Sequence, residues 1–360
     1  MKRAATNCPP SSLRMPAEWE PHTATWLAWP HCKDDWPGKF EPIAWVYAEI
    51  IRHLARHERV ELVVNDDAAE KGARKILDRA NALSDNVHFH RWPTDRVWTR
   101  DSGCTFAHSD AALEGSKPPG LAAITWRFNA WAKYPDYKHD AKLGSLMAEA
   151  AGARIVRPTF GKKRVVLEGG SIDVNGRGSL LTTEECLLSK VQQRNRSMDR
   201  KDYERVFAEY LGISNVIWLG SGITGDDTHG HVDDITRFVA PDTVVTAVEA
   251  NPADPNYEPL RENIRRLRAR SDENGNEVAI VELPMPAPVI FEGRRLPASY
   301  ANFYIANGVV LVPVFNDPND RVALDALADL FPDREVVGIY SGDLIWGFGA
   351  MHCLTQQQPA

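Results

Sequence analysis

Three segments of this sequence repeat a strand–turn–strand pattern at a nearly constant spacing. They are SIDVNGRGSLLTTEE at 171–185, ITRFVAPDTVVTAVE at 235–249 and ANFYIANGVVLVPVF at 301–315. In each, two runs of strand-forming residues flank a short turn of Gly, Asn or Asp, as a β-hairpin requires. The turns begin 65 and 66 residues apart, and one more step back leads to a fourth strand end near Asp110.

A helix-like segment and a short strand accompany each hairpin. The helix-like segments are 66–83, 142–150, 200–212, 258–270 and 321–331, and the strands after them are 86–92, 153–159, 214–220, 277–284 and 335–342. This order indicates a repeated ββαβ-type unit in five copies, rather than an ordinary α/β sheet with chance spacing. The fifth copy is split between 23–30 and 351–357. Because radial units form a propeller with an axial site, we expect a five-bladed, pseudo-symmetric α/β propeller.

The bulk composition limits the function and the location. The chain has 360 residues and a net charge of -7, which argues against nucleic-acid binding because phosphate contacts need a basic face. Five scattered cysteines without a CxxC motif indicate a reducing compartment. The start lacks a signal peptide, and no apolar stretch is long enough to cross a bilayer. We expect a cytoplasmic protein without a membrane partner, with a tail over 1–13 and one catalytic domain over 14–360. Whether the protein forms a homo-oligomer is left open by the sequence.

Five polar or glycine-rich loops lie between the short strands and the hairpins. They are RVWTRDSG at 96–103, VLEGG at 166–170, GDDTHGHVD at 225–233, PASY at 297–300 and IWGFGAMHC at 345–353. If the units are radial, these loops converge at one end of the propeller. Functional residues favour such loops on a rigid scaffold, so this end is where we expect the site.

Cys353 is either core filler or a nucleophile. It follows Gly347 and Gly349, which let the backbone approach a ligand closely. His352 is a poor base for it, because neighbouring side chains of an extended chain point to opposite faces. A general base must therefore come from another loop, and the other cysteines lack a glycine-rich setting.

The loop at 225–233 offers the imidazole and also an alternative chemistry. In an extended segment His229, His231 and Asp233 would share one face, which resembles the spacing of metal ligands. A metallohydrolase rests on that spacing alone. A solvated acidic turn is the third interpretation of the same residues.

Carboxylates complete the set of candidate groups. Asp101 lies in WTRDSG with Trp98 and Arg100, and Glu168 follows an apolar run where an unpaired charge would be costly. A surface ion pair would explain either carboxylate alone. Several carboxylates at one site are unfavourable unless a cation binds between them, and a guanidinium matches paired carboxylates. With a Cys/His pair, this set suggests nucleophilic hydrolysis of a guanidine or amidine.

Five motifs in this order resemble the agmatine deiminase family, which is related to the bacterial peptidyl-arginine deiminases in the guanidino-group modifying superfamily. They are RMPAEWEPH, WTRDSG, EGGSIDVNGRG, DDTHGHVDD and MHCLTQQQP, and they span Arg14 to Pro359. The family's fold is a five-bladed α/β propeller, in agreement with the repeat. The family usually has proline where this chain has Cys104. It commonly has GGGN where this chain reads GFGA, with Phe348 and Ala350.

The resemblance implies a role for each candidate residue. It makes Cys353 the nucleophile, His231 the acid/base and Glu168 the carboxylate that orients this histidine. The family's remaining site positions correspond to the guanidinium-binding pair Asp101 and Asp233, the aromatic residue Trp98, and Asp227 near the far end of the ligand.

The implied reaction is hydrolysis of agmatine to N-carbamoylputrescine and ammonia through a Cys amidino-thioether, without cofactor or metal. The expected partner is a small cationic guanidino substrate. The loops are rich in acids, and we take Arg100 as their only basic residue besides histidines, so a substrate carboxylate is disfavoured. Deiminases of free arginine or peptidyl-arginine are the alternatives within the enzyme class. A non-catalytic propeller scaffold is the alternative outside it.

Overall fold

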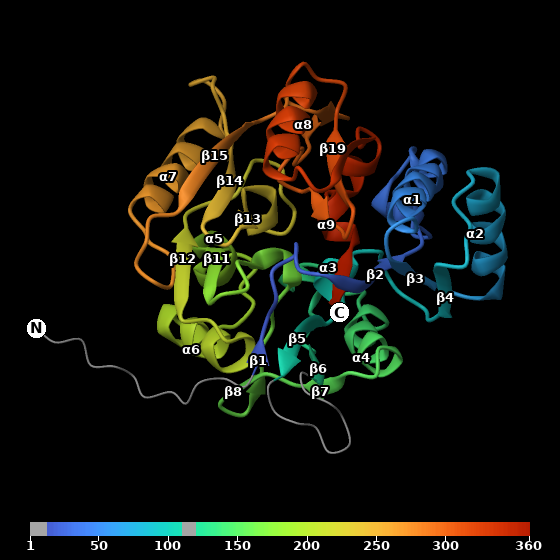
Figure 1. The fold of residues 1–360 in the computed structure, drawn as a ribbon, viewed down its shortest axis with the longest axis horizontal. Coiled ribbons are helices and arrows are strands. Elements are labelled where there is room, and N and C mark those ends of the chain that lie inside the picture. The colour runs from blue at the N-terminus through green and yellow to red at the C-terminus, as the bar shows by residue number, and fades with distance from the viewer. Residues whose placement is uncertain (1–12, 110–119) are drawn as a thin grey trace, which may run out of the picture.

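The computed structural model describes residues 13–109 and 120–360 (Figure 1). Most of the predicted tail and the strand end predicted near Asp110 lie outside these ranges. Leu13, the last residue of the predicted tail, begins the short strand β1 (Leu13–Arg14), which pairs with β5 (Thr105–Ser109). No helix of the described part is long and apolar enough to cross a membrane.

Five units have the predicted order of an antiparallel strand pair, a helix and a parallel third strand. Their elements are β5, β6 (Gly120–Ile124), α4 (Asp140–Ala150) and β7 (Arg154–Val156); β10 (Asp173–Val174), β11 (Ser179–Thr183), α5 (Glu184–Leu188), α6 (Arg200–Leu211) and β12 (Asn215–Leu219); β13 (Thr236–Ala240), β14 (Thr243–Val248), α7 (Tyr257–Arg268) and β15 (Ala279–Pro284); β18 (Tyr304–Ile305), β19 (Val309–Val314), α8 (Asn319–Leu330) and β20 (Glu335–Tyr340); and β21 (Gln356–Pro359), β2 (His22–Ala28), α1 (Phe40–Leu54) and β3 (Arg59–Val64). The three predicted hairpins are confirmed as β10–β11, β13–β14 and β18–β19.

The split unit joins the two ends of the chain. Strand β21 pairs antiparallel with β2, and Trp26 Nε1 donates to Gln358 Oε1 at 3.0 Å across the pair. Helix α1 and strand β3 were missed by the sequence pattern, which assigned the next elements, α2 (Asp67–Arg79) and β4 (Val87–Arg91), to this unit. Strand β4 is in fact an added fourth strand, parallel to β3.

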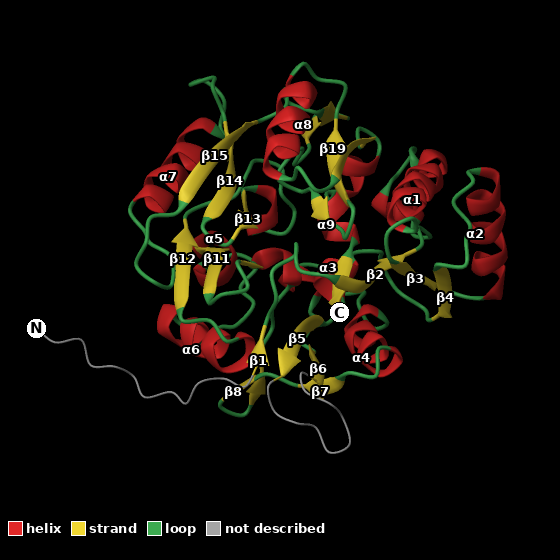
Figure 2. Cartoon of the chain, in the orientation of Figure 1, coloured by secondary structure: helices red, strands yellow, loops and turns green. Residues whose placement is uncertain are grey.

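The helices of the units lie outside and the strands nearer the centre (Figure 2). Apolar residues fill the space between them, because each helix buries one face there. Helix α1 buries Ile43, Tyr47 and Ile51 and contacts β3 of its own unit as well as β19 and β20 of another. The units surround the middle of the molecule, where short helices replace strands (Figure 1). Closure of the propeller stays a prediction.

Two ribbons and seven short helices complete the described part of the chain. The ribbons are β8 (Thr159–Phe160) with β9 (Lys163–Arg164) and β16 (Ile290–Phe291) with β17 (Arg294–Arg295). The short helices are η1 (Lys33–Asp35), α3 (Thr99–Ser102), η2 (Ala130–Ala132), η3 (Gly169–Ser171), η4 (Val232–Asp234), η5 (Leu344–Gly347) and α9 (Met351–Leu354). Four of them, α3, η3, η4 and α9, bring the candidate side chains together.

Candidate active site

The predicted loops meet, and they do so as short helices rather than extended segments. Asp101 lies in α3, Glu168 immediately precedes η3, Asp233 lies in η4 and Cys353 lies in α9. Helix α3 contacts both α9 and η3, and η3 contacts η4. The structure therefore places residues from four loops around one space.

Cys353 is buried and held by an asparagine. Asn302 Nδ2 donates to its Sγ at 3.1 Å, and Asn302 Oδ1 accepts from the backbone N–H groups of His352 and Cys353. The thiol lies 3.5 Å from Asp233 Oδ2. Burial, and then the charge of Asp233, raises the pKa of Cys353 well above its usual value. The thiol is thus kept protonated until something offsets these carboxylates.

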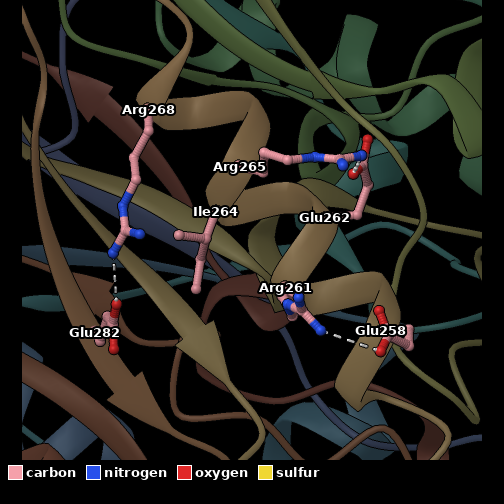
Figure 3. Close-up of a pocket in the computed structure, with 7 residues that line it drawn as sticks. All are labelled: Glu258, Arg261, Glu262, Ile264, Arg265, Arg268 and Glu282. Carbon is pink, nitrogen blue, oxygen red and sulfur yellow. Dashed lines mark hydrogen bonds and ion pairs between the residues drawn. The ribbon is translucent and has the colours of Figure 1, made fainter.

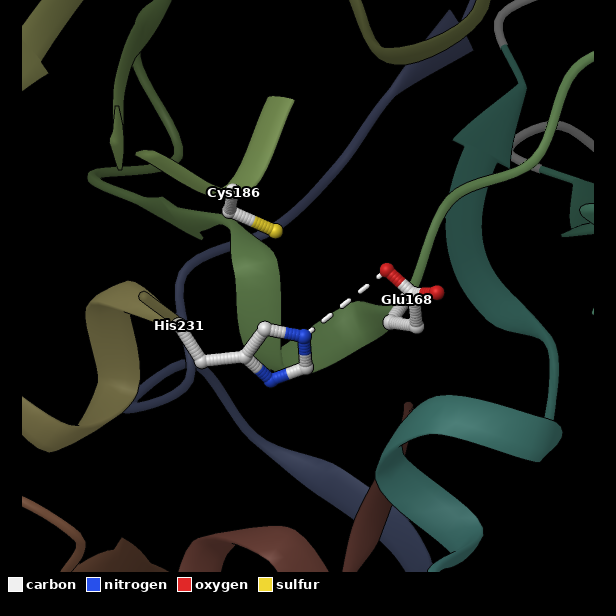
Figure 4. Close-up of side chains that lie close together, drawn as sticks. All are labelled: Glu168, Cys186 and His231. Atoms are coloured by element: carbon white, nitrogen blue, oxygen red, sulfur yellow. Dashed lines mark ion pairs between the residues drawn. The ribbon is translucent and has the colours of Figure 1, made fainter. Parts of the chain in front are cut away.

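His231 is completely buried among carboxylates. Its Nε2 faces Glu168 Oε2 (Figure 4), and the two atoms are 3.7 Å apart. Its Nδ1 lies 3.8 Å from Asp101 Oδ2 and 4.0 Å from Asp233 Oδ1. Burial alone would lower its pKa. Asp101, followed by Cys186 and Glu168, outweighs burial, so the pKa of His231 stands well above its usual value. A Cβ on Gly170 would come within 2.6 Å of Nδ1, so this space requires glycine.

Glu168 has a cation partner that the sequence did not reveal. Arg194 Nε donates to both of its oxygens, at 3.1 and 3.2 Å, and neither side chain is exposed. Although burial raises the pKa of Glu168, Arg194 and His231 bring it below its usual value. The sequence indicates that an unpaired charge at Glu168 would be costly, but no local signal picks Arg194 from the 42 Lys and Arg residues.

Asp101 and Asp233 are anchored differently. Asp101 accepts from Trp131 Nε1 at 2.8 Å and from the Gly170 N–H at 3.0 Å, and burial raises its pKa. Asp233 Oδ2 accepts from His352 Nδ1 at 2.7 Å, whereas its buried Oδ1 has no hydrogen-bond partner within the described residues. A buried carboxylate oxygen without a partner is available to a ligand N–H.

The shared face of His229, His231 and Asp233 that a metal site would need is not formed. His229 has a φ of 68°, and its ring bonds Ser189 at 3.2 Å and faces Glu185 at 3.7 Å, away from Asp233. Within the described part of the chain, two clusters of three possible metal ligands are present. One is Glu168, Cys186 and His231, and the other is Asp233, Asp234 and Cys353. The first of these already holds the Arg194 guanidinium, which opposes a second cation there.

A cavity of about 210 Å³ opens at the surface and reaches Cys353 and Asp101, whereas His231, Glu168 and Asp233 lie buried behind its lining. Its lining residues are Asp34, Asp35, Arg96, Trp98, Asp101, Trp131, Tyr134, Asp227, Thr228, Gly347, Phe348, Gly349 and Cys353. Trp98 lines this cavity, and its place beside a substrate stays a prediction. A Cβ on Gly349 would come within 2.5 Å of the Trp98 ring, which explains this glycine before the nucleophile.

A larger hollow, of about 500 Å³, lies against α7 and β15 (Figure 3). It contains none of the candidate residues. Its arginines face glutamates, as in the pairs Arg261–Glu258 at 3.4 Å and Arg268–Glu282 at 3.3 Å. We assign no chemistry to this hollow.

The rim of the cavity carries more positive charge than the sequence suggested. Asp227 Oδ1 faces Lys133 and Arg294, and its Oδ2 accepts from the Tyr134 hydroxyl at 2.6 Å. Arg96, which opens the same loop as Asp101, also lines the cavity. The premise that the loops lack cations other than Arg100 was therefore wrong.

Arg100 itself is a buried partner and not a surface one. Its NH2 group donates to Glu18 Oε2 at 3.0 Å, and its NH1 group donates to Gln357 Oε1 at 2.6 Å. Asn302, Arg194 and Trp131 also contact the site and were not predicted from the sequence. Asn302 follows the loop at 297–300, so proximity to a converging loop was the one available signal.

A sequence model of the Porphyromonas-type peptidyl-arginine deiminases matches residues 14–359. The chain belongs to this family. An agmatine deiminase of Pseudomonas syringae pv. tomato is 35% identical over 371 residues, which cover 97% of this chain and 96% of that protein. One of Pseudomonas aeruginosa is 34% identical over 372 residues, with the same shares.

Solved structures within this deiminase family have the same fold. The agmatine deiminase of Enterococcus faecalis is 29% identical and superposes with a TM-score of 0.88, covering 100% of this chain and 99% of that one. A substrate-bound cysteine-to-serine variant of the agmatine deiminase of C. jejuni is 27% identical with a TM-score of 0.83, covering 96% of each. The predicted pentein-like α/β fold is confirmed.

Proposed function

We propose that the chain is a hydrolase of linear amidines that converts agmatine to N-carbamoylputrescine and ammonia. The observation that carries this proposal is the Cys353 thiol at the cavity, 3.5 Å from Asp233, with His231 within 4.0 Å of the same carboxylate. A thiol, an imidazole and carboxylates around a cation-sized space suit attack on a guanidinium carbon. Full-length relatives called agmatine deiminases support the substrate.

In the first half of the reaction, the substrate's positive charge offsets the carboxylates that hold the thiol protonated. Cys353 then loses its proton to solvent and its sulfur bonds to the guanidinium carbon. His231, protonated because its pKa is raised, donates a proton to the departing nitrogen, and ammonia leaves. A covalent amidino-thioether on Cys353 remains.

In the second half, His231 acts as a base. It takes a proton from water, and the oxygen adds to the amidino carbon. The carbon–sulfur bond then breaks, releasing the ureido product and the Cys353 thiol. Glu168 stabilises the charged imidazole throughout and fixes its orientation.

The remaining residues bind the substrate. Asp101 and the free Oδ1 of Asp233 take the guanidinium N–H groups, and the Trp98 ring lines the path of the alkyl chain. Asp227, at the rim, is placed for the distal ammonium. Because it already faces Lys133 and Arg294, the ammonium must displace or share these partners.

The test is a side-by-side assay for ureido product from agmatine, arginine and a blocked arginyl peptide. Agmatine should give N-carbamoylputrescine and ammonia, and Cys353→Ser should give neither. Mass spectrometry of quenched enzyme should find the adduct on the peptide that contains Cys353. An adduct on Cys32 or Cys104, or no ureido product from millimolar agmatine, would overturn the proposal.

A second candidate substrate is free arginine, which the rim favours. An α-amino acid carries both an ammonium and a carboxylate, and the rim offers acids as well as the cations Arg96, Lys133 and Arg294. Equal kcat/KM for arginine and agmatine would assign the enzyme to both. The cytoplasmic location and the oligomeric state stay predictions.

A further inference from the structure

Glu18, within the RMPAEWEPH segment, has no part in the reaction proposed above. The structure places this buried side chain where four units meet. Its Oε1 accepts from Arg237 at 2.8 Å and from the Ile305 N–H at 2.9 Å. Its Oε2 lies 3.0 Å from Arg100 and 2.9 Å from His352 Nε2. Both oxygens are therefore fully used, and the carboxylate has one fixed orientation.

His352, which precedes the nucleophile, connects this carboxylate to the site. Its Nε2 faces Glu18 at 2.9 Å and its Nδ1 faces Asp233 at 2.7 Å. Ionised carboxylates only accept hydrogen bonds, so these two contacts fix the orientation of the ring between Glu18 and Asp233. The expectation that His352 is simply turned away from Cys353 was incomplete, because the ring holds Asp233 instead.

Asp233 is the member of this chain that lies beside the nucleophile, with its Oδ2 3.5 Å from Cys353 Sγ. His352 holds its Oδ2, and its Oδ1 stays without a hydrogen-bond partner among the described residues. Burial would raise the pKa of Asp233, but the hydrogen bond and charge of His352 keep it below its usual value. One oxygen is thus anchored and the other is left for a guanidinium.

We propose that Glu18 and His352 are positioning residues, which together hold the Asp233 carboxylate in the orientation that receives the substrate beside Cys353. Glu18 fixes the ring of His352, and the ring fixes Asp233. The N-terminal segment around Glu18 is then part of the catalytic apparatus. A displacement of about 1 Å at such a carboxylate is enough to cost about a hundredfold in rate.

A matched control lies on the other side of the same network. Asp173 Oδ2 accepts from Arg237 Nε at 2.5 Å, and it is buried like Glu18, but it does not contact His352. Glu18→Gln and Asp173→Asn each remove one buried carboxylate from Arg237. Both should lower the melting temperature, whereas Glu18→Gln alone should disturb Asp233.

The first measurement uses turnover and so rests on the proposed function. Glu18→Gln should lower kcat/KM at least tenfold, and Asp173→Asn should leave it within about twofold. His352→Leu should lose about a hundredfold. His352→Asn, which can still donate to Asp233 from the position of Nδ1, should recover at least tenfold of that loss.

The second measurement needs no substrate. Chloroacetamide and chloroacetamidine both alkylate a thiol with loss of chloride, but one reagent is neutral and the other is cationic. A well-placed Asp233 favours the cationic reagent at Cys353. The ratio of the two inactivation rates, cationic over neutral, should fall at least fivefold in Glu18→Gln and His352→Leu and stay unchanged in Asp173→Asn.

Equal behaviour of Glu18→Gln and Asp173→Asn in both measurements would make Glu18 a structural residue and overturn the proposal. Equal rates for His352→Asn and His352→Leu would make His352 a structural residue and would also overturn the proposal. This pair of variants tests the proposal if Glu18→Gln does not fold. If no guanidine is hydrolysed but the reagent ratio changes as expected, the proposed reaction fails while the positioning role stands.

Discussion

The buried residues behind the cavity, called the floor here, and the residues at its rim hold their carboxylates in different ways. At the floor, Glu168 is paired with Arg194 and Asp233 with His352, and these side chains are at most 2% exposed. At the rim, Asp227 is paired with Lys133 and Arg294, whose side chains are 36% and 50% exposed. The floor therefore has a fixed arrangement of charges, whereas the rim has one that a ligand can rearrange.

The difference follows from solvent. Breaking a buried ion pair leaves an uncompensated charge at a cost of about 3–5 kcal/mol, whereas an exposed pair contributes about 0–1 kcal/mol. The floor can thus keep acids ionised beside a thiol before any substrate arrives. The rim can exchange Lys133 or Arg294 for a substrate ammonium at little cost, so it tunes preference and does not perform chemistry.

The largest expected effect is at the floor, in Glu168→Gln. The variant keeps the shape but removes the charge beside His231, so kcat should fall by about a thousandfold or more, as at other base-orienting carboxylates. The matched control is Glu185→Gln, which alters the carboxylate facing His229 at 3.7 Å. Steady-state kinetics on agmatine should leave this control near wild type. A near-normal kcat in Glu168→Gln would show that activity does not depend on the fixed charge of the floor, and the contrast with the rim would fail.

An intermediate effect is expected at the rim from pH. Burial raises the pKa of Asp35 to about 6, although the nearby Arg96 counteracts it. Asp35 is thus neutral below pH 6 and leaves the charge of Arg96 unbalanced, so KM for agmatine should fall several-fold as pH rises through about 6. Asp35→Asn should lose this dependence. The same dependence in the variant would assign it to another group.

The ionisation of Asp35 also affects folding, with the opposite sign. A carboxyl whose pKa is higher in the folded state holds its proton more tightly there. The free energy of unfolding should therefore decrease as pH rises from about 4 to about 6. Chemical denaturation across this window should show a flatter slope in Asp35→Asn than in wild type.

A small effect is expected from Lys133→Met. The change makes the rim more negative by one charge, so kcat/KM should rise for agmatine and fall for arginine, each by no more than about fivefold. Lys71→Met, which breaks an exposed pair with Asp67, is the control. A change above about a hundredfold would show that the rim is as fixed as the floor.

No effect is expected from removing metal. The thiol reaction needs no Lewis acid, and Glu168 already has a cation partner in Arg194. Full activity should survive dialysis against EDTA, measured with the same ureido assay. Loss of activity that zinc or manganese restores would favour the metallohydrolase.

The sequence predicted the repeat and the convergence of the loops, because hairpin turns and helix periodicity are local signals. It also named Cys353, His231 and Glu168, which the structure brings together, although their roles stay proposals. What it could not supply were the partners. Arg194 lies 26 residues from Glu168, and nothing in the local pattern connects the two.

Side-chain directions were the second failure, and they have a backbone cause. An extended loop would alternate its side chains, which placed His229 beside Asp233. The left-handed backbone at His229 and at Gly230, followed by η4, rotates these side chains apart. Such a turn changes the direction of the side chains within two residues, and a periodic sequence pattern does not predict that change.

The pairing of β21 with β2 also sets an order of events during protein synthesis. Trp26 and Gln358 are 332 residues apart, so the first of these strands leaves the ribosome long before its neighbour exists. Cys353 emerges after every other candidate residue of the site. A nascent chain therefore carries the histidine and the carboxylates without the thiol, and under the proposed mechanism it cannot turn over substrate until translation has almost reached Pro359. Contacts between such distant segments also form slowly, so we expect this edge to be the last part of the fold to mature.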